Sequence, residues 1–229
     1  MKMIGLIGGM SWESSAQYYR LINQGTRDRL GLIASARCLL WSFDFAEIER
    51  LQHQGDWPAL GELLGDAAAR LEQAGAELLL ICTNTMHRVA ADVERRVTAP
   101  LLHIADPTAA AITARGFARV GLLGTAFTME QDFYTGRLRD RHGIEVLVPG
   151  TEDRAAVHRI IYEELVAGII RPESRATFRA VIARLISDGA QAVILGCTEI
   201  MLLVGAEDSA VPLFDTTTLH AEAAIVEAL

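Results

Sequence analysis

The sequence predicts an α/β fold of two pseudo-symmetric domains, each a four-stranded parallel sheet flanked by helices. Two observations support it: short apolar runs of strand type alternate with longer amphipathic stretches, and the second half repeats the first. The strand runs are apolar almost throughout, as expected for parallel strands covered on both faces. The chain has 229 residues, 51% of them hydrophobic and 22% charged, so it can bury a sizeable core without disulfides.

The strands and helices follow one another in a regular order. In Trp57–Ala74 the residues Leu60, Leu64 and Leu71 recur at helical spacing, and Arg175–Leu185 shows the same pattern. Such helices cover the faces of a sheet. Eight runs are expected as strands, in chain order Met3–Ile7, Cys38–Phe43, Glu77–Cys82, Leu101–Ile104, Arg119–Leu123, Glu145–Val148, Ala192–Gly196 and Val211–Phe214.

An internal repeat relates the two halves. Three segments recur in the same order at an offset of 112 to 116 residues, and chance would rarely produce such an agreement. We therefore expect one domain from residues 1–98 together with a C-terminal helix at 215–229, and a second from residues 99–214. The matched pairs are Ile4–Gly8 with Val120–Gly124, Ala74–Thr85 with Asp188–Glu199, and Pro100–Leu102 with Pro212–Phe214.

The repeat also indicates where a ligand would bind. In open parallel sheets, ligands bind outside the carboxyl ends of the strands. The loops Cys82–Thr85 and Gly196–Glu199 occupy matched strand ends, so that Thr83 corresponds to Cys197. We expect these two loops to form opposite walls of one cleft between the domains.

Two further strand-end loops are rich in small and hydroxylated residues. Gly8–Trp12 follows the first strand, and Gly124–Thr128 follows its repeat partner. Small residues allow close approach of the backbone, and helix N-termini favour anions. The Gly8-Gly9 pair lacks the later glycine of a dinucleotide fingerprint, so these loops suit a carboxylate as readily as a phosphate.

The three cysteines differ in their surroundings. Cys38 and Cys82 lie in strand runs and are expected as small buried hydrophobic residues. Cys197 follows a glycine at a strand end, and Thr-Glu then opens the next helix, whose N-terminus is expected to lower the pKa of the thiol. On its own Cys197 suits a structural or a catalytic role. His87 would orient a group in the cleft or simply lie on the helix that follows the strand.

Several classes of function are excluded. The formal charge of −8 and the lack of a basic stripe argue against nucleic-acid binding. No apolar run approaches the length of a membrane span, and the first residues lack the pattern of a signal peptide. A sparse, odd set of cysteines indicates a reducing cytoplasm. No metal site is expected, because the remaining histidines show no ligand spacing with cysteine: His53, His103, His142, His158 and His220.

The strand-end motifs resemble those of the pyridoxal-phosphate-independent aspartate/glutamate racemases, over essentially the whole chain. The likeness is strongest to a bacterial branch of L-selective, broad-specificity amino-acid racemases. It implies two similar α/β domains with the active site between them, no cofactor, a small amino-acid substrate, a cytoplasmic location and a homodimer. The motifs that resemble the family are Ile4–Ser14, Cys82–His87, Gly121–Thr125 and Gly196–Glu199.

The resemblance implies a two-sided proton transfer. The common family pattern has one cysteine on each face of the substrate, but here the first is replaced by Thr83, and Cys82 lies one position too early. A shift of one residue in a strand turns a side chain to the other face. The resemblance then implies that Cys197 takes the proton from the L-enantiomer and that the Thr83 side returns one, with weak turnover of the D-enantiomer. Two contacts of about 3 Å flanking one carbon would separate Thr83 and Cys197 by roughly 6 to 9 Å.

The resemblance further suggests which residues bind the substrate. Aspartate-specific members have an arginine after the second strand, where Arg50 is a match but Gln52 the better candidate, and a later lysine whose position falls on Val166. An amino acid of aspartate or glutamate type, or a broader set, is therefore expected. The expected substrate-binding residues are Met10, Gln52, Asn84, Thr85, Thr125 and Thr198.

Two alternatives remain open at this point. Decarboxylases of substituted malonates resemble this family and keep only the second cysteine, but a glycine would be expected there in place of Thr83. A catalytically inactive amino-acid-binding protein would also use a two-domain cleft. Proton exchange distinguishes the last case, because a binding protein would not incorporate deuterium at the α-carbon.

Overall fold

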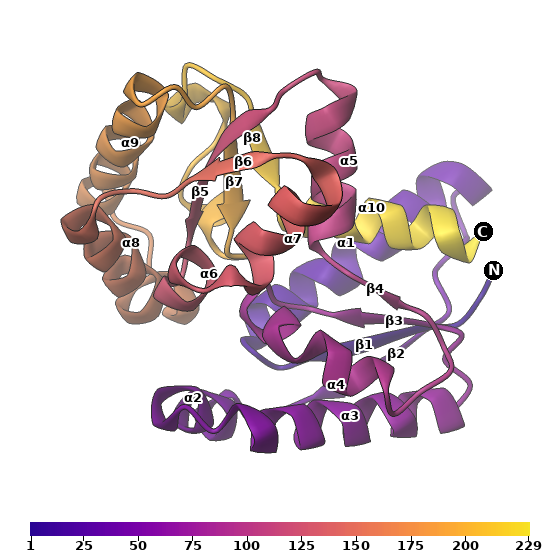
Figure 1. The fold of residues 1–229 in the computed structure, drawn as a ribbon. Helices are drawn as coiled ribbons and strands as arrows, with labels where there is room; N and C mark the ends of the chain where they lie inside the picture. Colours follow the sequence, from indigo (N-terminus) through magenta and orange to yellow (C-terminus); the bar gives the residue numbers. More distant parts are fainter. The chain divides into compact units, whose positions relative to one another are not determined.

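The computed structural model describes residues 1–229, which divide into two compact units (Figure 1). The first unit comprises Met1–Ile104 and His220–Leu229, and the second comprises Ala105–Leu219. Each unit contains one four-stranded sheet in which every pairing is parallel. The fold class predicted from the sequence is confirmed.

The first unit has the strand order β2-β1-β3-β4. β1 lies in the interior of the sheet, where Ile7 pairs with Trp41 on one side and with Ile81 on the other. The elements are β1 (Ile4–Gly8), α1 (Trp12–Leu30), β2 (Cys38–Ser42), α2 (Phe45–Gln54), α3 (Trp57–Gln73), β3 (Leu78–Ile81), the 3₁₀ helix η1 (Thr85–Val89), α4 (Ala90–Glu94), β4 (Leu101–Leu102) and the later part of α10 (Thr216–Ala228).

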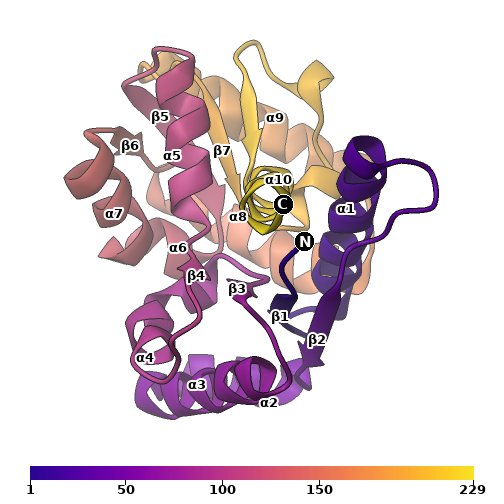
Figure 2. The ribbon, with the colours of Figure 1, turned by 90° about the vertical axis from the view of Figure 1, so that its right-hand side faces the viewer.

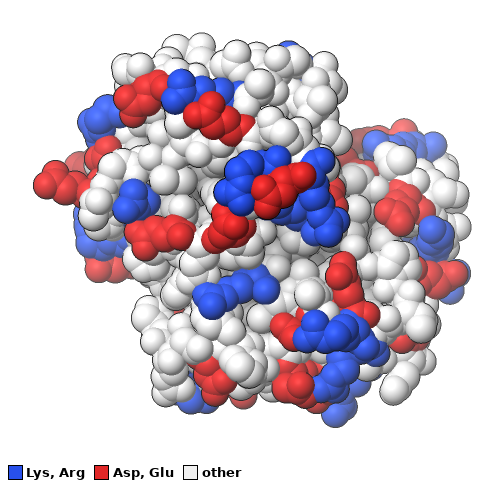
Figure 3. Space-filling model, in the orientation of Figure 1, with Lys and Arg blue, Asp and Glu red and all other residues white.

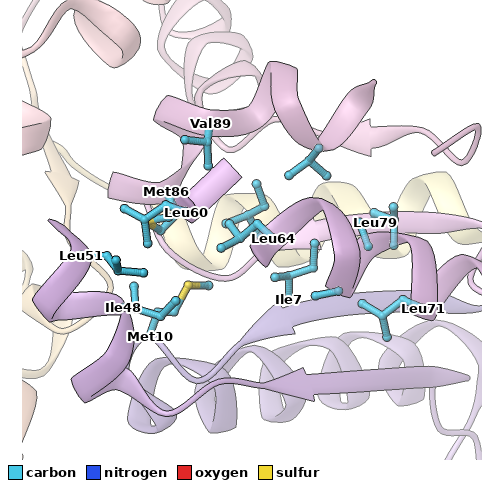
Figure 4. Packing of buried hydrophobic residues seen from close by; sticks show 14 of the residues in the cluster. Ile7, Met10, Ile48, Leu51, Leu60, Leu64, Leu71, Leu79, Met86 and Val89 are labelled. Atoms are coloured by element: carbon cyan, nitrogen blue, oxygen red, sulfur yellow. The ribbon is translucent and has the colours of Figure 1, made fainter. Parts of the chain in front are cut away.

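Two apolar layers enclose this first sheet. On one face Ile7, Leu79 and Ile81 pack against α2, α3 and α4, and the close view in Figure 4 labels Ile7 and Leu79 in this layer. On the other face Ile4 and Leu80 pack against α1 and α10, and Figure 2 shows α2–α3 and α10 on opposite sides of the strands. The alternation of strand side chains between these layers explains why β1 and β3 are apolar at every position.

The second unit has the equivalent strand order, β6-β5-β7-β8. In Figure 1, α8 and α9 lie on one side of these strands and α5 and α7 on the other. The elements are α5 (Ala105–Ala114), β5 (Arg119–Gly124), α6 (Ala126–Glu130), α7 (Asp132–His142), β6 (Glu145–Leu147), α8 (Thr151–Glu163), η2 (Leu165–Ala167), α9 (Pro172–Ser187), β7 (Val193–Gly196), η3 (Ile200–Leu202), η4 (Ala206–Asp208), β8 (Leu213–Asp215) and the start of α10.

All eight expected strands occur, and the matching strand orders agree with the internal repeat. The boundaries of the units differ from the expected 98/99 and 214/215. Residues 99–104 belong with the first unit because β4 hydrogen-bonds to β3, with Leu79 opposite Leu101. The chain returns to the first unit inside α10, at His220, rather than at the start of that helix.

The surface has mixed charge. Figure 3 shows Lys and Arg interspersed with Asp and Glu over the face in view. Many of these charges are paired within a unit: Arg96, in the turn after α4, contacts Glu62 and Asp66 of α3, and Arg184 contacts Asp153 at 2.6 Å between α9 and α8. No helix is both long enough and apolar enough to span a membrane.

Candidate active site

In the first unit, two loops with predicted site residues leave the same edge of the sheet. β1 and β3 are parallel neighbours, so the segment after Gly8 and the segment after Ile81 emerge side by side. The Ser14 hydroxyl at the start of α1 donates a 2.9 Å hydrogen bond to the Cys82 carbonyl oxygen. The Gly9 N–H donates to the Ser15 hydroxyl at 2.8 Å. These two bonds fix the β1 and β3 ends to α1.

Thr83 and Cys82 occupy different environments although they are adjacent. Cys82 is buried in the apolar layer that faces α1 and α10, and burial raises the pKa of its thiol. Thr83 is half-buried at the strand end. The buried neighbours Asn84 and Thr85 follow it and lead into η1. The position of Cys82 in the core supports setting it aside as the first proton-transfer group.

His87 binds the backbone of this loop. Its Nδ1 lies 2.8 Å from the Thr83 carbonyl oxygen, and its Nε2 accepts a 3.1 Å hydrogen bond from the Ile104 N–H. The His87 ring is buried and contacts His103 and His220, with ring centroids 4.5 Å and 5.8 Å away. His87 lies in η1, the short helix that follows the strand, and its ring contacts the backbone of the strand end.

The structure brings Met10 and Gln52 to one region of the first unit. α2 begins at Asp44, whose carboxylate accepts from the Ala46 N–H, and this helix presents Gln52 as a buried residue. The Gln52 amide donates to the Met86 sulfur at 3.1 Å, and Met86 belongs to the same apolar cluster as Met10, as the labelled side chains in Figure 4 show.

The alternative contact considered at this position has a different setting. Arg50 is exposed on α2 and donates to the Gln54 side chain at 3.1 Å. Gln52, which is buried beside Met86, is therefore the better placed of the two for a contact inside the unit.

In the second unit, β5 and β7 end together at a very close approach. Gly124 pairs with Gly196, and a Cβ atom added to Gly124 would lie 2.9 Å from the Gly196 carbonyl oxygen. A Cβ on Gly196 would in turn lie 3.0 Å from the Leu123 carbonyl oxygen. Both positions therefore require glycine. The close pairing of Gly124 with Gly196 sets the backbone positions of the residues that follow them, Thr125 and Cys197.

The Cys197 thiol is hydrogen-bonded to a buried carboxylate. Its Sγ donates to Oε2 of Glu199 at 3.0 Å, and the Thr198 hydroxyl donates to the same oxygen at 2.8 Å. Cys197 is 9% exposed and Glu199 is 4% exposed. Bulk water therefore screens this cluster of thiol, hydroxyl and carboxylate only weakly.

This geometry corrects the expected direction of the Cys197 pKa. Burial, followed by the charge of Glu199 and the hydrogen bond to it, raises the pKa well above the ordinary thiol value. The N–H groups of Thr198 and Glu199 act in the opposite direction but are outweighed. The segment that follows is the three-residue 3₁₀ helix Ile200–Leu202, which lacks the aligned peptide dipoles of a long helix.

The remaining predicted residues of the second unit have internal partners. The Thr125 hydroxyl caps α6, accepting from the Thr128 N–H at 3.4 Å, and lies 3.3 Å from the Thr128 hydroxyl. Thr198 is bound to Glu199, as described. Val166 is half-buried in η2, so the position of the family lysine is occupied by an apolar side chain.

Glu199 is a candidate site residue that the sequence pattern alone does not single out. It stands in the Gly196–Glu199 motif, where the sequence predicts only the start of a helix. An acidic residue two positions after a strand-end cysteine was the available signal. Elsewhere, no group of three or more His, Cys, Asp or Glu side chains is arranged to hold a metal ion.

Comparison with known proteins decides the family. The model of the Asp/Glu/hydantoin racemase family matches residues 7–224. The chain belongs to this family. It is thus an isomerase of the racemase type, and the comparisons give the malonate decarboxylase alternative no support.

Solved structures of family members agree over the full length. A Yersinia pestis protein named for the Asp/Glu racemases is 56% identical, with a TM-score of 0.93 over 100% of this chain and 99% of that one. An aspartate racemase homologue from Pyrococcus horikoshii OT3 is 36% identical, with a TM-score of 0.85 over 99% of this chain and 98% of that one.

Curated racemases are more distant. The broad-specificity amino-acid racemase RacX of Bacillus subtilis (strain 168) is 25% identical over 70% of this chain and 68% of its own length. A glutamate racemase from Roseiflexus sp. (strain RS-1) is 31% identical, but the match covers 60% of this chain and only 49% of that protein.

Proposed function

We propose that the chain racemises L-amino acids of the aspartate/glutamate type, or a broader set, without a cofactor. Cys197 would act on one face of the α-carbon and Thr83 on the other. The observation that supports this most is the Cys197 thiol donating to the buried Glu199 carboxylate at the carboxyl end of β7. A thiol beside a proton acceptor at a strand end is equipped for acid/base chemistry.

The first step would remove the α-proton of the L-enantiomer. Glu199 accepts the Sγ proton of Cys197, and the resulting thiolate takes the α-proton, leaving the electron pair of the broken C–H bond on the α-carbon. Glu199 is neutral while it holds this proton, so its charge, which together with burial raises the pKa of Cys197, does not oppose the thiolate at this step.

The second step would deliver a proton to the opposite face. The Thr83 hydroxyl donates or relays a proton to the carbanion, giving the D-enantiomer, and solvent replaces that proton. A hydroxyl holds its proton much more tightly than a thiol does, so this face is the slower one. Cys197 keeps the proton taken from the substrate, and Glu199 releases its proton to solvent, which closes the cycle.

Binding of the substrate carboxylate is proposed for hydroxyl and amide groups at the strand ends. Asn84 and Thr85 would contribute from the first unit, and Thr125 and Thr198 from the second. Donors directed at this carboxylate stabilise charge that develops on it as the α-proton leaves. Met10 and Gln52 are proposed to contact the substrate side chain, since both are positioned by the Met86 cluster.

The chain is also proposed to be a cytoplasmic homodimer. The connection between α1 and β2 exposes Leu32 and Ile33 almost completely, and Trp12 and Leu40 of α1 and β2 are also exposed. Exposed apolar side chains of this number favour a protein interface. All three cysteines are free, which suits a reducing compartment. Sedimentation as a monomer across micromolar concentrations would contradict the dimer.

A panel of L- and D-amino acids in deuterium oxide tests the proposed function. Proton NMR measures deuterium at the α-carbon, and chiral chromatography measures inversion. We expect both with L-aspartate, L-glutamate or another L-amino acid, and 5-substituted hydantoins serve as the comparison set named by the family. Binding without any α-deuteration would instead identify an inactive amino-acid-binding protein.

A further inference from the structure

We propose that His87 is a positioning residue for racemisation, which holds Thr83 in place through the Thr83 carbonyl group. The inference rests on the proposed role of Thr83 as the proton donor of one face. It concerns a side chain that neither removes nor delivers the substrate proton. Its action would be to set the direction of the Thr83 hydroxyl by fixing the backbone from which that side chain projects.

The local backbone makes this contact necessary. Thr83 precedes η1, and in this 3₁₀ geometry the His87 N–H donates to the Asn84 carbonyl oxygen, at 3.1 Å, instead of to the Thr83 carbonyl oxygen as in an α-helix. The His87 side chain folds back and places Nδ1 at 2.8 Å from the Thr83 oxygen. A side-chain N–H thus replaces the backbone N–H that an α-helix would supply.

A second hydrogen bond determines which ring nitrogen of His87 has the proton. The Ile104 N–H donates to Nε2 at 3.1 Å, so Nε2 must be unprotonated. Because a carbonyl oxygen only accepts, Nδ1 must have the hydrogen in its bond to Thr83. Ile104 is the residue at which the chain leaves the first unit and continues into α5. Its backbone N–H thus fixes the tautomer of a ring that lies 17 residues earlier in the chain.

The surroundings hold the ring in this orientation. The His220 ring lies 5.8 Å from that of His87 and is itself fixed, because its Nδ1 lies 2.8 Å from the Tyr18 hydroxyl and its Nε2 2.8 Å from the Leu102 carbonyl oxygen. His87, His220 and Tyr18 are all buried. A ring that is buried and bonded at both nitrogens has one allowed position, as a positioning residue requires.

At the equivalent strand end, after β7, a backbone N–H takes the place of the histidine. There the Ile200 N–H donates to the Cys197 carbonyl oxygen at 3.1 Å, so that backbone supplies the bond which a side chain supplies at Thr83. Substituting His87 should therefore impair the Thr83 face and leave proton removal at the Cys197 face intact. A purely structural role would lower both activities in parallel.

Three substitutions separate the two hydrogen bonds of His87. His87→Asn keeps an N–H donor near the Nδ1 position and loses the acceptor for Ile104. His87→Gln keeps an acceptor near the Nε2 position and loses the donor to Thr83. His87→Ala loses both. His53→Asn is the matched control, because His53 is exposed on α2, where it contacts Glu49.

The kinetic readout is the ratio of inversion to α-deuteration with retention, starting from an L-amino acid in deuterium oxide. We expect the ratio to fall about 10-fold or more in His87→Ala and His87→Gln, as misplacement of a reacting group would cause. It should stay close to the unsubstituted value in His87→Asn and His53→Asn. If His87→Ala does not fold, the Asn and Gln variants provide the same comparison. An unchanged ratio in His87→Gln, or a parallel loss of both activities, would overturn the inference.

A second measurement needs no turnover. The ¹⁵N resonances of the His87 ring identify its tautomer, and we expect hydrogen on Nδ1 alone. A ring with hydrogen on Nε2, or on both nitrogens at neutral pH, would overturn the inference whatever the protein catalyses. Absence of any α-deuteration by the unsubstituted protein would instead overturn the proposed function, and the His87 role with it.

Discussion

The strand ends of β3 and β7 occupy matched positions in two related units but differ in chemistry. At β7 a buried thiol donates to the buried Glu199 carboxylate, and burial and charge raise its pKa. At β3 the corresponding side chain is the half-buried Thr83 hydroxyl, whose carbonyl group is bound by His87. The same scaffold thus presents a thiol at one strand end and a hydroxyl at the other, so the repeat preserves the position of the strand end but not its chemistry.

Thermodynamics limits how this asymmetry can appear. The two enantiomers have equal free energies in solution, so kcat/KM for racemisation must be the same in both directions. A lower kcat for the D-enantiomer must therefore be accompanied by a proportionally lower KM. The difference between the faces is best seen in steps that use one face alone, such as α-deuteration with retention.

The largest effect should follow from Cys197→Ser. A hydroxyl in place of the thiol should reduce α-proton exchange of the L-substrate by about 10²- to 10⁴-fold, the range typical of losing a general acid or base. Cys38→Ser is the matched control, since Cys38 lies half-buried in β2 and its substitution should leave exchange unchanged. Near-normal exchange by Cys197→Ser would show that another group removes the proton.

Glu199→Gln should have the next largest effect. The neutral amide removes the negative charge that disfavours the thiolate, so the pKa of Cys197 should fall toward its ordinary value. Thiolate absorbance against pH measures this shift. Exchange should nevertheless slow by about 10-fold or more, because the thiol has lost its proton acceptor. Glu207→Gln is the control, as that carboxylate is 68% exposed in the same unit.

The dependence of α-proton exchange on pH shows in which direction the pKa of Cys197 is shifted. With a raised pKa, the thiolate fraction of Cys197 increases with pH, and exchange should still be rising above about pH 8.5, where an ordinary thiol is half ionised. In Glu199→Gln the same rise should occur at lower pH. A profile already level at neutral pH in the unsubstituted protein would contradict the arrangement of Cys197 and Glu199.

Thr83→Cys tests the other strand end. A thiol at this position would restore two groups of similar acidity and should increase conversion of the D-enantiomer by about 10-fold. By the equality of kcat/KM, conversion from the L-enantiomer should increase to the same extent. Thr83→Ser retains a hydroxyl and should change little. A correctly folded Thr83→Cys without any gain would mean that the hydroxyl does not limit inversion.

Ser14→Ala should have the smallest effect. It removes the 2.9 Å hydrogen bond to the Cys82 carbonyl oxygen, one residue before Thr83, and should lower the free energy of unfolding by about 1 kcal/mol. Urea unfolding measures this difference, with the exposed Ser35→Ala as the control. Equal stability of the two variants would show that this bond does not fix the β3 end.

The sequence was sufficient to predict both sheets because strand periodicity and a repeat are local or pairwise patterns. The sequence predicts a boundary at 98/99, whereas the first unit of the structure extends to Ile104, since only the pairing of β4 with β3 shows where residues 99–104 belong. The pKa of Cys197 shifts upward instead of downward because of burial and of the Glu199 side chain, which folds back on the thiol; no spacing rule reveals either. The His87 tautomer depends on Ile104, a contact between residues distant in sequence.

The most direct test of unequal faces is the substrate deuterium isotope effect on racemisation, measured from each enantiomer labelled at the α-carbon. If proton transfer at the Thr83 face limits the rate, the label is transferred in the limiting step only when the D-enantiomer is the substrate. The account predicts a larger isotope effect on kcat/KM from the D-enantiomer than from the L-enantiomer. Equal effects, or a larger effect from the L-enantiomer, would contradict it.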